Sequence, residues 1–382
     1  MQPGTHLWVG TPAAAGVSWR EEVSYRSTMG IGAFTSARDL LLRAADRELT
    51  GEEACTEIAS AIRRVAPYDA AAVMTTDPDT NLPAGGMVTG FDTSACVPFW
   101  DNELLDPDFN KFNDLARSVD PVATLAEVTD GDLDRSPRHT KLYAGFGASD
   151  ELRIALVAGS SCLGIGSFIR CDGEVYSPTE ISDVRHLLAP AVGVLRAALG
   201  TMSEPLTDHG PVVVLLGADG TVLSQSEGAE TVLEDLRIDI DTGLPGTLHV
   251  AAARARSSRS ATRLTTRLRG SSGRWVRVHV APMEGSLDAV SLTIDAAQPS
   301  DLVPIMLDSY GLTARETDIV LLLCRGIGTK EIATELMISV HTVRDHLKAI
   351  FEKAGVSSRG ELVAKLFTNH LLDTFHDTVV HD

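Results

Sequence analysis

The sequence contains no long apolar run. Its longest apolar stretches, Val212 to Ala218 and Ile319 to Cys324, are far shorter than the roughly 20 residues that a membrane-spanning helix needs. The N-terminal residues also lack the basic segment, apolar core and cleavage site of a secretory signal. We therefore predict a cytoplasmic protein with no membrane partner.

Cysteine is scarce and irregularly spaced. The cysteines form no C-x-x-C pair and have no neighbouring histidines, which argues against a disulfide framework and against a zinc site. We expect buried, reduced thiols. A redox-sensing cysteine is the alternative, although no spacing favours it. The five cysteines are Cys55, Cys96, Cys162, Cys171 and Cys324.

Catalytic and cofactor motifs are also missing. Asp130 to Asp134 begins like a calcium loop, but Arg135 and Lys141 stand where that loop needs Gly and Glu. Gly164 to Gly166 lacks the third glycine of a dinucleotide fingerprint, and Gly159 to Leu163 fails the nucleophile-elbow pattern. We find neither H-E-x-x-H nor a phosphate-binding GKS or GKT sequence, nor the acidic pocket and lysine of a phospho-acceptor domain. The sequence predicts a protein that is not an enzyme, with no metal and no evident cofactor.

Positive charge is in short supply except in one segment. The net charge is -19, yet residues 312–367 hold eight Lys and Arg against seven Asp and Glu, so the rest of the chain carries about -20. Double-stranded DNA is a dense polyanion that repels an acidic surface. If the chain binds DNA, the segment 312–367 is the part expected to contact it.

The first part of the chain predicts an α+β domain. Residues 1–35 resemble a flexible leader, and residues 36–200 form the predicted domain. Within it, hydrophobic periodicity predicts helices and alternation predicts strands, in the order of an antiparallel sheet packed on helices. The expected helices are 36–49, 51–66 and Thr179 to Leu199, and the expected strands are 70–75, 87–91, 153–158 and 163–170.

Five short motifs make this domain resemble a GAF sensor domain of actinobacterial regulators. The excess of Arg over Lys, 27 to 6, is similarly typical of GC-rich bacterial genomes. The resemblance implies a fold and names no ligand. The motifs are DPDFNKF (106–112), SPRH (136–139), DELR (150–153), LGIGSFIRCDG (163–173) and YSPTE (176–180).

A second α+β domain is expected at 211–298, after a polar linker at 201–210. Two strands joined by an Asp-Gly turn are followed by two helices and three strands, the order of a PAS domain. SGRWVRVH (272–279) resembles a motif in the PAS-like middle of the same regulators. The expected strands are 212–216 and 222–225, then 262–269, 274–281 and 289–294, with helices near 227–236 and 244–256.

This second domain contains an arginine-rich stretch. Residues 242–283 hold eight arginines and no acidic residue, and strand alternation places Arg263, Arg267 and Arg269 on one face. Two hypotheses remain open. The face is either a solvated outer surface or a docking surface for the acidic N-terminal domain or for nucleic acid.

The segment 312–370 predicts four helices, after a linker helix at 299–311 and before a tail at 371–382. Capping boxes begin the first helix at Thr313 and the fourth at Ser358, a threonine cap is expected at Thr329, and Ser339 caps the third helix, 340–354. Two short helices joined by a tight turn fit a DNA major groove. On the third helix, the apolar face comprises Val340, Val343, Leu347, Ile350, Phe351 and Ala354, and the opposite face comprises His341, Arg344, Asp345, Lys348 and Glu352.

The same segment resembles a LuxR-type helix-turn-helix domain, an all-α fold of four helices. The pieces that carry the resemblance are LTARE (312–316), KEIA (330–333), ISVHTVRDHL (338–347) and GVSSR (355–359). The resemblance implies double-stranded DNA as a partner, a homodimer and contact with RNA polymerase. The implied DNA contacts are Thr329, Lys330, Ser339, His341, Thr342, Arg344, Asp345, Lys348 and Arg359, and the implied dimer contacts are Leu362, Val363 and Leu366.

Asp345 departs from the family pattern because many relatives carry an uncharged residue there. Its carboxylate could accept a hydrogen bond from cytosine N4, or it could form a helix pair with Arg344 or Lys348. His346 points sideways and is expected to be partly buried. The apolar stripe of the fourth helix could equally pack on the third helix.

Taken together, the sequence predicts a regulator of transcription whose DNA-binding domain is controlled by a ligand or partner of its GAF-like and PAS-like domains. The ligand is unknown. The alternative is a constitutive DNA binder whose N-terminal domains serve dimerisation or protein interaction.

Overall fold

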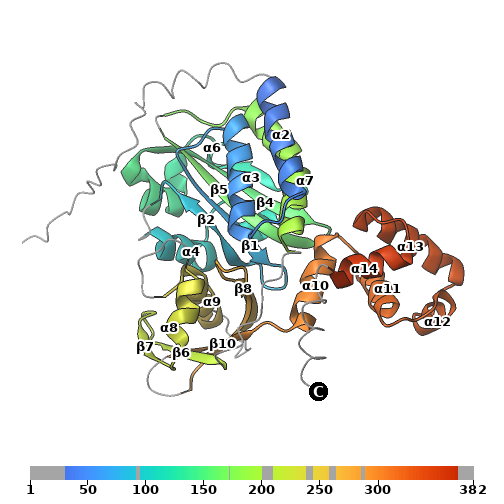
Figure 1. The fold of residues 1–382 in the computed structure, drawn as a ribbon. Coiled ribbons are helices and arrows are strands. Elements are labelled where there is room, and N and C mark those ends of the chain that lie inside the picture. The colour runs from blue at the N-terminus through green and yellow to red at the C-terminus, as the bar shows by residue number, and fades with distance from the viewer. Residues whose placement is uncertain are drawn as a thin grey trace, which may run out of the picture.

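Three parts follow one another along the chain (Figure 1). We call them the N-terminal unit (31–199), the middle unit (210–297) and the C-terminal bundle (311–368), with helix α10 (Pro299–Ser309) between the last two. The computed structural model describes residues 31–91, 95–171, 173–199, 210–237, 244–257, 264–284 and 289–368. Within these ranges, no helix is long and apolar enough to cross a bilayer, and no group of three or more His, Cys, Asp or Glu could hold a metal ion.

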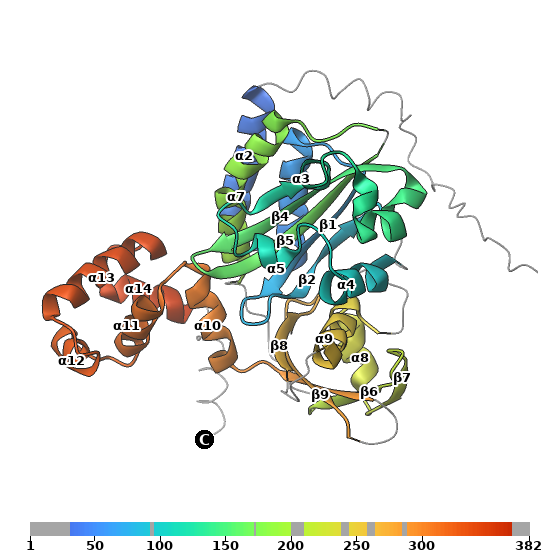
Figure 2. The same ribbon diagram turned by 180° about the vertical axis from the view of Figure 1, so that it is seen from behind.

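The N-terminal unit is a five-stranded antiparallel sheet with helices on both faces. Its strand order is β2-β1-β5-β4-β3. Helices α2, α3 and α7 pack together on one face, while α4 and α5 lie on the other (Figures 1 and 2). The strands are β1 (Ala70–Asp77), β2 (Leu82–Thr89), β3 (Val122–Thr124), β4 (Ala148–Ala158) and β5 (Ser161–Cys171). The α-helices are α2 (Ile31–Ala45), α3 (Gly51–Val65), α4 (Cys96–Leu105), α5 (Phe112–Leu115), α6 (Leu125–Val128) and α7 (Pro178–Leu199), with short turns η3 (Leu133–Arg135), η4 (His139–Tyr143) and η5 (Ala144–Phe146).

Three details of this unit differ from the sequence-based expectation. Helix α2 begins at Ile31, inside the predicted leader. Strand β2 begins at Leu82 rather than at residue 87, because Gly85 and Gly86 interrupt the apolar alternation that identifies a strand. Strand β3, Val122–Thr124, was not predicted, because three residues are too few to show a period.

Several residues of the GAF-like motifs meet in a buried ionic network beneath α4 and α5. Arg138 and Arg153 are both fully buried and lie on either side of Glu151. Nη2 of Arg138 lies 2.7 Å from Oε2 of Glu151, and Nε of Arg153 lies 2.9 Å from Oε1. Arg153 also reaches Glu103 Oε2 at 2.7 Å, and Arg138 lies 3.7 Å from Asp108. Burial alone would raise the pKa of Glu151, but the two guanidinium groups hold it at about 2. The motifs therefore supply a charged core that fixes α4 and α5 against the sheet.

The thiols are as expected, reduced and largely inside the protein. None of the five cysteines, all of which lie in the described ranges, forms a disulfide; Cys55 and Cys162 are buried and the other three are half-buried. Burial raises the pKa of Cys55 to about 12 and that of Cys162 to about 11. Both thiols are therefore protonated and unreactive at neutral pH.

The middle unit is a second five-stranded antiparallel sheet, in the order β7-β6-β10-β9-β8. Its apolar core is continuous with that of the N-terminal unit, because α9 packs on α4 and on β2 (Figure 1). The strands are β6 (Val212–Leu216), β7 (Val222–Gln225), β8 (Leu264–Arg269), β9 (Trp275–Pro282) and β10 (Val290–Ala296), and the helices are α8 (Ala229–Asp235) and α9 (Gly246–Ser257).

The described part of the arginine-rich stretch, strand β8, shows whether this face is solvated or docks on another domain. Arg267 inserts into the N-terminal unit and binds the fully buried Asp77: Nη2 lies 2.6 Å from Oδ1, and the backbone N 2.6 Å from Oδ2. Arg267 also contacts Asp79, and Thr266 donates to Asp77 at 3.2 Å. The docking hypothesis therefore holds for Arg267, whereas Arg263 lies outside the described residues.

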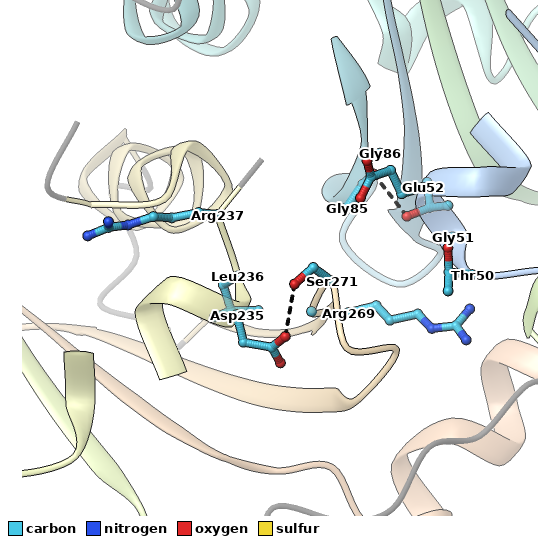
Figure 3. A pocket seen from close by; sticks show the side chains of 12 residues that line it. Thr50, Gly51, Glu52, Gly85, Gly86, Asp235, Leu236, Arg237, Arg269 and Ser271 are labelled. Atoms are coloured by element: carbon cyan, nitrogen blue, oxygen red, sulfur yellow. Dashed lines mark hydrogen bonds between the residues drawn. The ribbon is translucent and has the colours of Figure 1, made fainter. Parts of the chain in front are cut away.

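Arg269 is the second docking arginine on β8. It lies beside Thr50 and Gly51 at the start of α3, where a shallow pocket separates the two units (Figure 3). Its Nη1 donates to the carbonyl of Ala198 at 2.7 Å. The carbonyl oxygen of Arg269 lies close to Gly85, since a Cβ atom added to this glycine would be 3.1 Å from that oxygen. The middle unit is thus held against both β2 and the end of α7.

Candidate DNA-binding site

The C-terminal bundle consists of four helices around a small apolar core. They are α11 (Ala314–Cys324), α12 (Thr329–Glu335), α13 (Val340–Ala354) and α14 (Arg359–Thr368). The predicted capping box at Thr313 is present: its Oγ1 accepts from Glu316 N at 3.3 Å, and Glu316 Oε2 accepts from Thr313 N at 2.7 Å. Lys353 donates to the same carboxylate at 2.7 Å and so ties α13 to the start of α11.

Two predicted caps are wrong in detail. Helix α12 is capped at Gly328, whose backbone N donates to Glu331 Oε2 at 2.9 Å, so Thr329 is the first helical residue and not the cap. Helix α14 has only half of the expected box, because Glu361 accepts from Ser357 rather than from Ser358. In both cases a glutamate in the first turn of the helix accepts from the backbone N–H of the residue one position before the predicted one.

The connection between α12 and α13 positions the third helix. Met337 has a positive φ of 54° and a 90% exposed side chain, a conformation that is rare outside glycine and asparagine. Ser339 then caps α13 as predicted, accepting from Thr342 N at 3.0 Å. The pattern of the sequence gave no sign of a left-handed residue at this methionine.

Helix α13 presents the predicted polar face to solvent. Arg344, Asp345 and Lys348 are exposed, while Val343, Ile350 and Ala354 are buried in the bundle core. Leu347 and Phe351 lie on the predicted apolar face and pack against this core, but they are only half-buried. Together with Arg344, Lys348, Glu352 and Val356 they line an open apolar hollow of about 380 Å³.

The two cations of this face, Arg344 and Lys348, form no ion pair within the described ranges. Neither Arg344 nor Lys348 has a carboxylate within 4 Å among the residues that the structure describes. Of the two alternatives left open for Asp345, the helix pair with Arg344 or Lys348 is therefore not found. Instead Asp345 Oδ2 lies 3.9 Å from His341 Nε2, and both of these side chains are largely exposed.

The other predicted contacts lie around this face. Lys330, Ser339 and His341 are exposed, and Thr329 and Thr342 are half-buried at the first turns of α12 and α13. Arg359 is half-buried, and its Nη2 lies 3.5 Å from the carbonyl of Leu323. His346 is half-buried, as predicted.

The predicted dimer residues of α14 do not share one environment. Leu362 and Leu366 are 2% and 6% exposed and belong to the core of the bundle. Val363 is half-buried and keeps part of its surface accessible. Packing on the rest of the bundle, the alternative considered for this stripe, accounts for the two leucines.

Comparison with known proteins agrees with this geometry. Residues 310–366 match the family described as bacterial regulatory proteins, luxR family. The chain is 42% identical over 62 residues to the oxygen regulatory protein NreC of Staphylococcus carnosus (strain TM300), covering 16% of this chain and 29% of that protein. It is 38% identical over 91 residues to the monoamine regulon transcriptional regulator of Klebsiella aerogenes, covering 24% and 38%. The C-terminal bundle is therefore a helix-turn-helix domain of the luxR family.

The two sequence similarities cover only a small part of this chain and less than half of each relative. The chain spans about a third of the length of the curated relatives it matches. Among solved structures, Escherichia coli SdiA is similar at 14% sequence identity, with a TM-score of 0.28 over 88% of this chain and 98% of that one. A score of that size does not establish a common overall fold.

Proposed function

We propose that this chain is a sequence-specific, DNA-binding regulator of transcription that contacts the major groove through the exposed face of α13. One observation carries the proposal: Arg344 and Lys348 are exposed and unneutralised on the third helix of a luxR-type domain, in a chain of net charge -19. Such cations contact phosphates and base edges, and an arginine paired with guanine contributes about 1–3 kcal/mol of discrimination.

Asp345 has a defined part in this proposal. Its carboxylate is exposed, and its only described ion pair is the long one with His341, so it remains able to accept a hydrogen bond from cytosine N4. Thr329, Lys330, Ser339, Thr342 and Arg359 would contact the DNA backbone. Val363 of α14 would contribute to a homodimer, so that two bundles face two half-sites.

The N-terminal and middle units are proposed to be GAF-like and PAS-like sensor domains that control the bundle. Arg267 supports this coupling because it binds Asp77 of the N-terminal unit and also donates, through Nη1, to the carbonyl of Asp301 in α10 at 2.9 Å. At the other end of α10, Arg196 of α7 donates to the carbonyl of Ser309 at 2.8 Å. A change in either unit would thus reach the helix that leads into the bundle.

The test is DNA capture from a genomic library by the full-length protein at fixed salt, beside the double variant Arg344→Ala/Lys348→Ala. The matched control is Arg117→Ala/Arg185→Ala, which removes the same charge from exposed positions of the N-terminal unit. We expect sequence-specific enrichment for the wild type and the control, and none for the α13 variant. Equal enrichment by all three proteins would exclude α13 as the DNA-binding element.

The constitutive alternative is tested on the same full-length protein. Asp77→Asn removes the charge that Arg267 binds and weakens the junction between the two units. If the units control DNA binding, the affinity for the enriched site changes in this variant while its bundle stays folded. An unchanged affinity would favour constitutive binding, with the N-terminal units serving assembly only.

A further inference from the structure

A cavity of about 600 Å³ lies where the N-terminal unit, α10 and the C-terminal bundle meet. Its walls come from the end of α2 and the turn after it, the last turns of α7, the end of α10, the end of α13 and Lys365 of α14. Figures 1 and 2 show α10 and α14 side by side at this junction. The volume is within the range of small-molecule sites, roughly 300–1,000 Å³.

The inner wall of the cavity combines an aromatic ring with two cations. The guanidinium carbon of Arg196 lies 5.2 Å from the ring centroid of Tyr310, and the ammonium nitrogen of Lys365 lies 5.7 Å from it. Tyr310 is 8% exposed. Leu199 and Met306 add apolar surface to the same wall. The lining therefore offers both apolar surface and two cations to a ligand that carries a negative group on an apolar body.

The two cations differ from the others in the lining because neither forms an ion pair among the described residues. Glu361, four residues before Lys365 on α14, does feel its charge: hydrogen bonds from Ser357 and the charge of Lys365 both lower the pKa of Glu361. Arg47 pairs with Glu57, and Lys353 with Glu316. Within the described chain, neither Arg196 nor Lys365 has a carboxylate within 4 Å. Burial lowers the pKa of Arg196, which is the direction expected for a desolvated cation that lacks an anionic partner.

Both cations also keep donors available. Arg196 uses Nε for the carbonyl of Ser309, and Lys365 uses one of its three protons for the carbonyl of Ala354 at 2.9 Å. Asp46, Glu48 and Glu352 line the cavity too, but they are exposed to solvent. Water and salt screen such exposed charges, whereas a half-buried guanidinium acts through a lower dielectric.

We propose that this cavity binds a small organic anion with an apolar body, whose carboxylate, sulfonate or phosphate group contacts Arg196 and Lys365 and whose body covers Tyr310, Leu199 and Met306. Because the walls belong to both the N-terminal unit and the bundle, such a ligand stabilises the one arrangement in which those walls come together. Its effect on transcription rests on the proposed DNA-binding function, whereas its binding does not.

The probe for the test is 8-anilinonaphthalene-1-sulfonate, an aromatic anion, titrated into the full-length protein by fluorescence. We expect one saturable site, and weaker binding of N-phenyl-1-naphthylamine, which has the same rings without the sulfonate. Arg196→Gln should weaken binding of the anion by about tenfold or more, since a hydrogen bond to a charged group contributes about 1.5–3 kcal/mol. Arg185→Gln, on the same helix but outside the cavity, should bind the anion as the wild type does.

A second variant keeps the test informative if Arg196→Gln folds poorly. Ala197→Trp leaves every charge in place and fills the cavity, so it should abolish the saturable site. Absence of a saturable site in the wild type, equal affinity for the neutral analogue, or unchanged binding in both cavity variants would overturn the proposal.

The ligand-binding proposal for the cavity can be tested independently of the DNA-binding proposal for α13. Arg344→Ala/Lys348→Ala lies outside the cavity and should bind the sulfonate with wild-type affinity even after it has lost DNA. Loss of sulfonate binding in that variant would contradict the assigned location of the site.

Discussion

The arginines of the N-terminal unit and the cations of α13 occupy opposite environments. Arg138 and Arg153 are fully buried, and each lies within 4 Å of two carboxylates. Arg344 and Lys348 are exposed and have no such partner in the described part of the chain. The same chemical groups therefore hold elements together in one region and are left available to a polyanion in the other.

This difference shows how an acidic chain could carry the proposed DNA-binding face. A buried cation needs a paired acid, because an isolated charge in the interior costs several kcal/mol. An exposed cation needs none, and each phosphate that it neutralises releases a counterion. The count of charges along a sequence therefore says less about nucleic-acid binding than the number of cations that the fold leaves unpaired.

The largest effect is expected from Glu151→Ala, which leaves Arg138 and Arg153 without their shared partner. Removing one member of a buried ion pair destabilises a protein by about 3–5 kcal/mol, because the remaining charge stays desolvated. Urea unfolding monitored by tryptophan fluorescence, to which Trp100 contributes from beside this network, measures the change.

The matched control for Glu151→Ala is Asp120→Ala, which breaks the exposed pair with Arg185 at 2.7 Å. Exposed pairs contribute about 1 kcal/mol or less. A loss of similar size in both variants would mean that burial does not distinguish the two kinds of ion pair.

Acid should remove the contribution of Glu151 selectively. The pKa of this carboxyl falls from 4.5 to about 2 on folding, so the unfolded chain binds the proton more readily than the native one. The stabilisation is complete above about pH 4.5 and is lost as the pH falls toward about 2.

The measurement compares the wild type with Glu151→Gln, in which the group cannot ionise. Urea midpoints from about pH 6 to about pH 3 should show the difference between the two proteins shrinking with acid. A difference that stays constant over this range would indicate that Glu151 acts through its shape and hydrogen bonds rather than through its charge.

On α13 the expectation is reversed: Arg344→Ala should leave stability unchanged and weaken DNA binding. Removing one arginine that contacts a base is expected to cost about 1–3 kcal/mol of the free energy that discriminates the right base from the wrong one, so the sequence preference should also relax. Lys348→Ala should instead weaken binding to all sequences and reduce the salt slope by about one if it contacts a phosphate. Fluorescence anisotropy with the captured site, at several salt concentrations, separates the two cases.

Local sequence patterns were sufficient for most of the secondary structure. The alternation in β8 and β9 and the capping residues Thr313 and Ser339 gave the correct elements, because these signals lie within a few residues of one another. The apolar period of α13 likewise identified its exposed face. For the candidate site, the sequence thus predicted correctly that Arg344, Asp345 and Lys348 are exposed, while their contact with DNA stays a prediction.

Contacts between distant residues could not be predicted in this way. Arg267 finds Asp77 from 190 positions away, and nothing in either local pattern indicates the pairing. The cavity at Arg196, Tyr310 and Lys365 likewise exists only because three parts of the chain meet. Leu347 and Phe351 share the period of buried residues but stay half-exposed, because the neighbouring elements do not cover that side of α13.

The smallest predicted effect compares two threonines at helix starts, one a cap and one not. Thr313→Ala removes the hydroxyl that accepts from Glu316 N at 3.3 Å, and loss of an N-cap costs about 1 kcal/mol. Thr329→Ala should change stability by less than about 0.5 kcal/mol, since Gly328 occupies the cap and its N–H is bound by Glu331.

Thermal unfolding of the two full-length variants decides between the structural assignment and the one expected from sequence. If Thr329→Ala were the more destabilising, the cap of α12 would be the threonine after all, and the start of this helix would have to be moved by one residue. If it is neutral for stability but weakens DNA binding, Thr329 belongs with Arg344 and Lys348, as a side chain whose role lies in contact with DNA rather than within the fold.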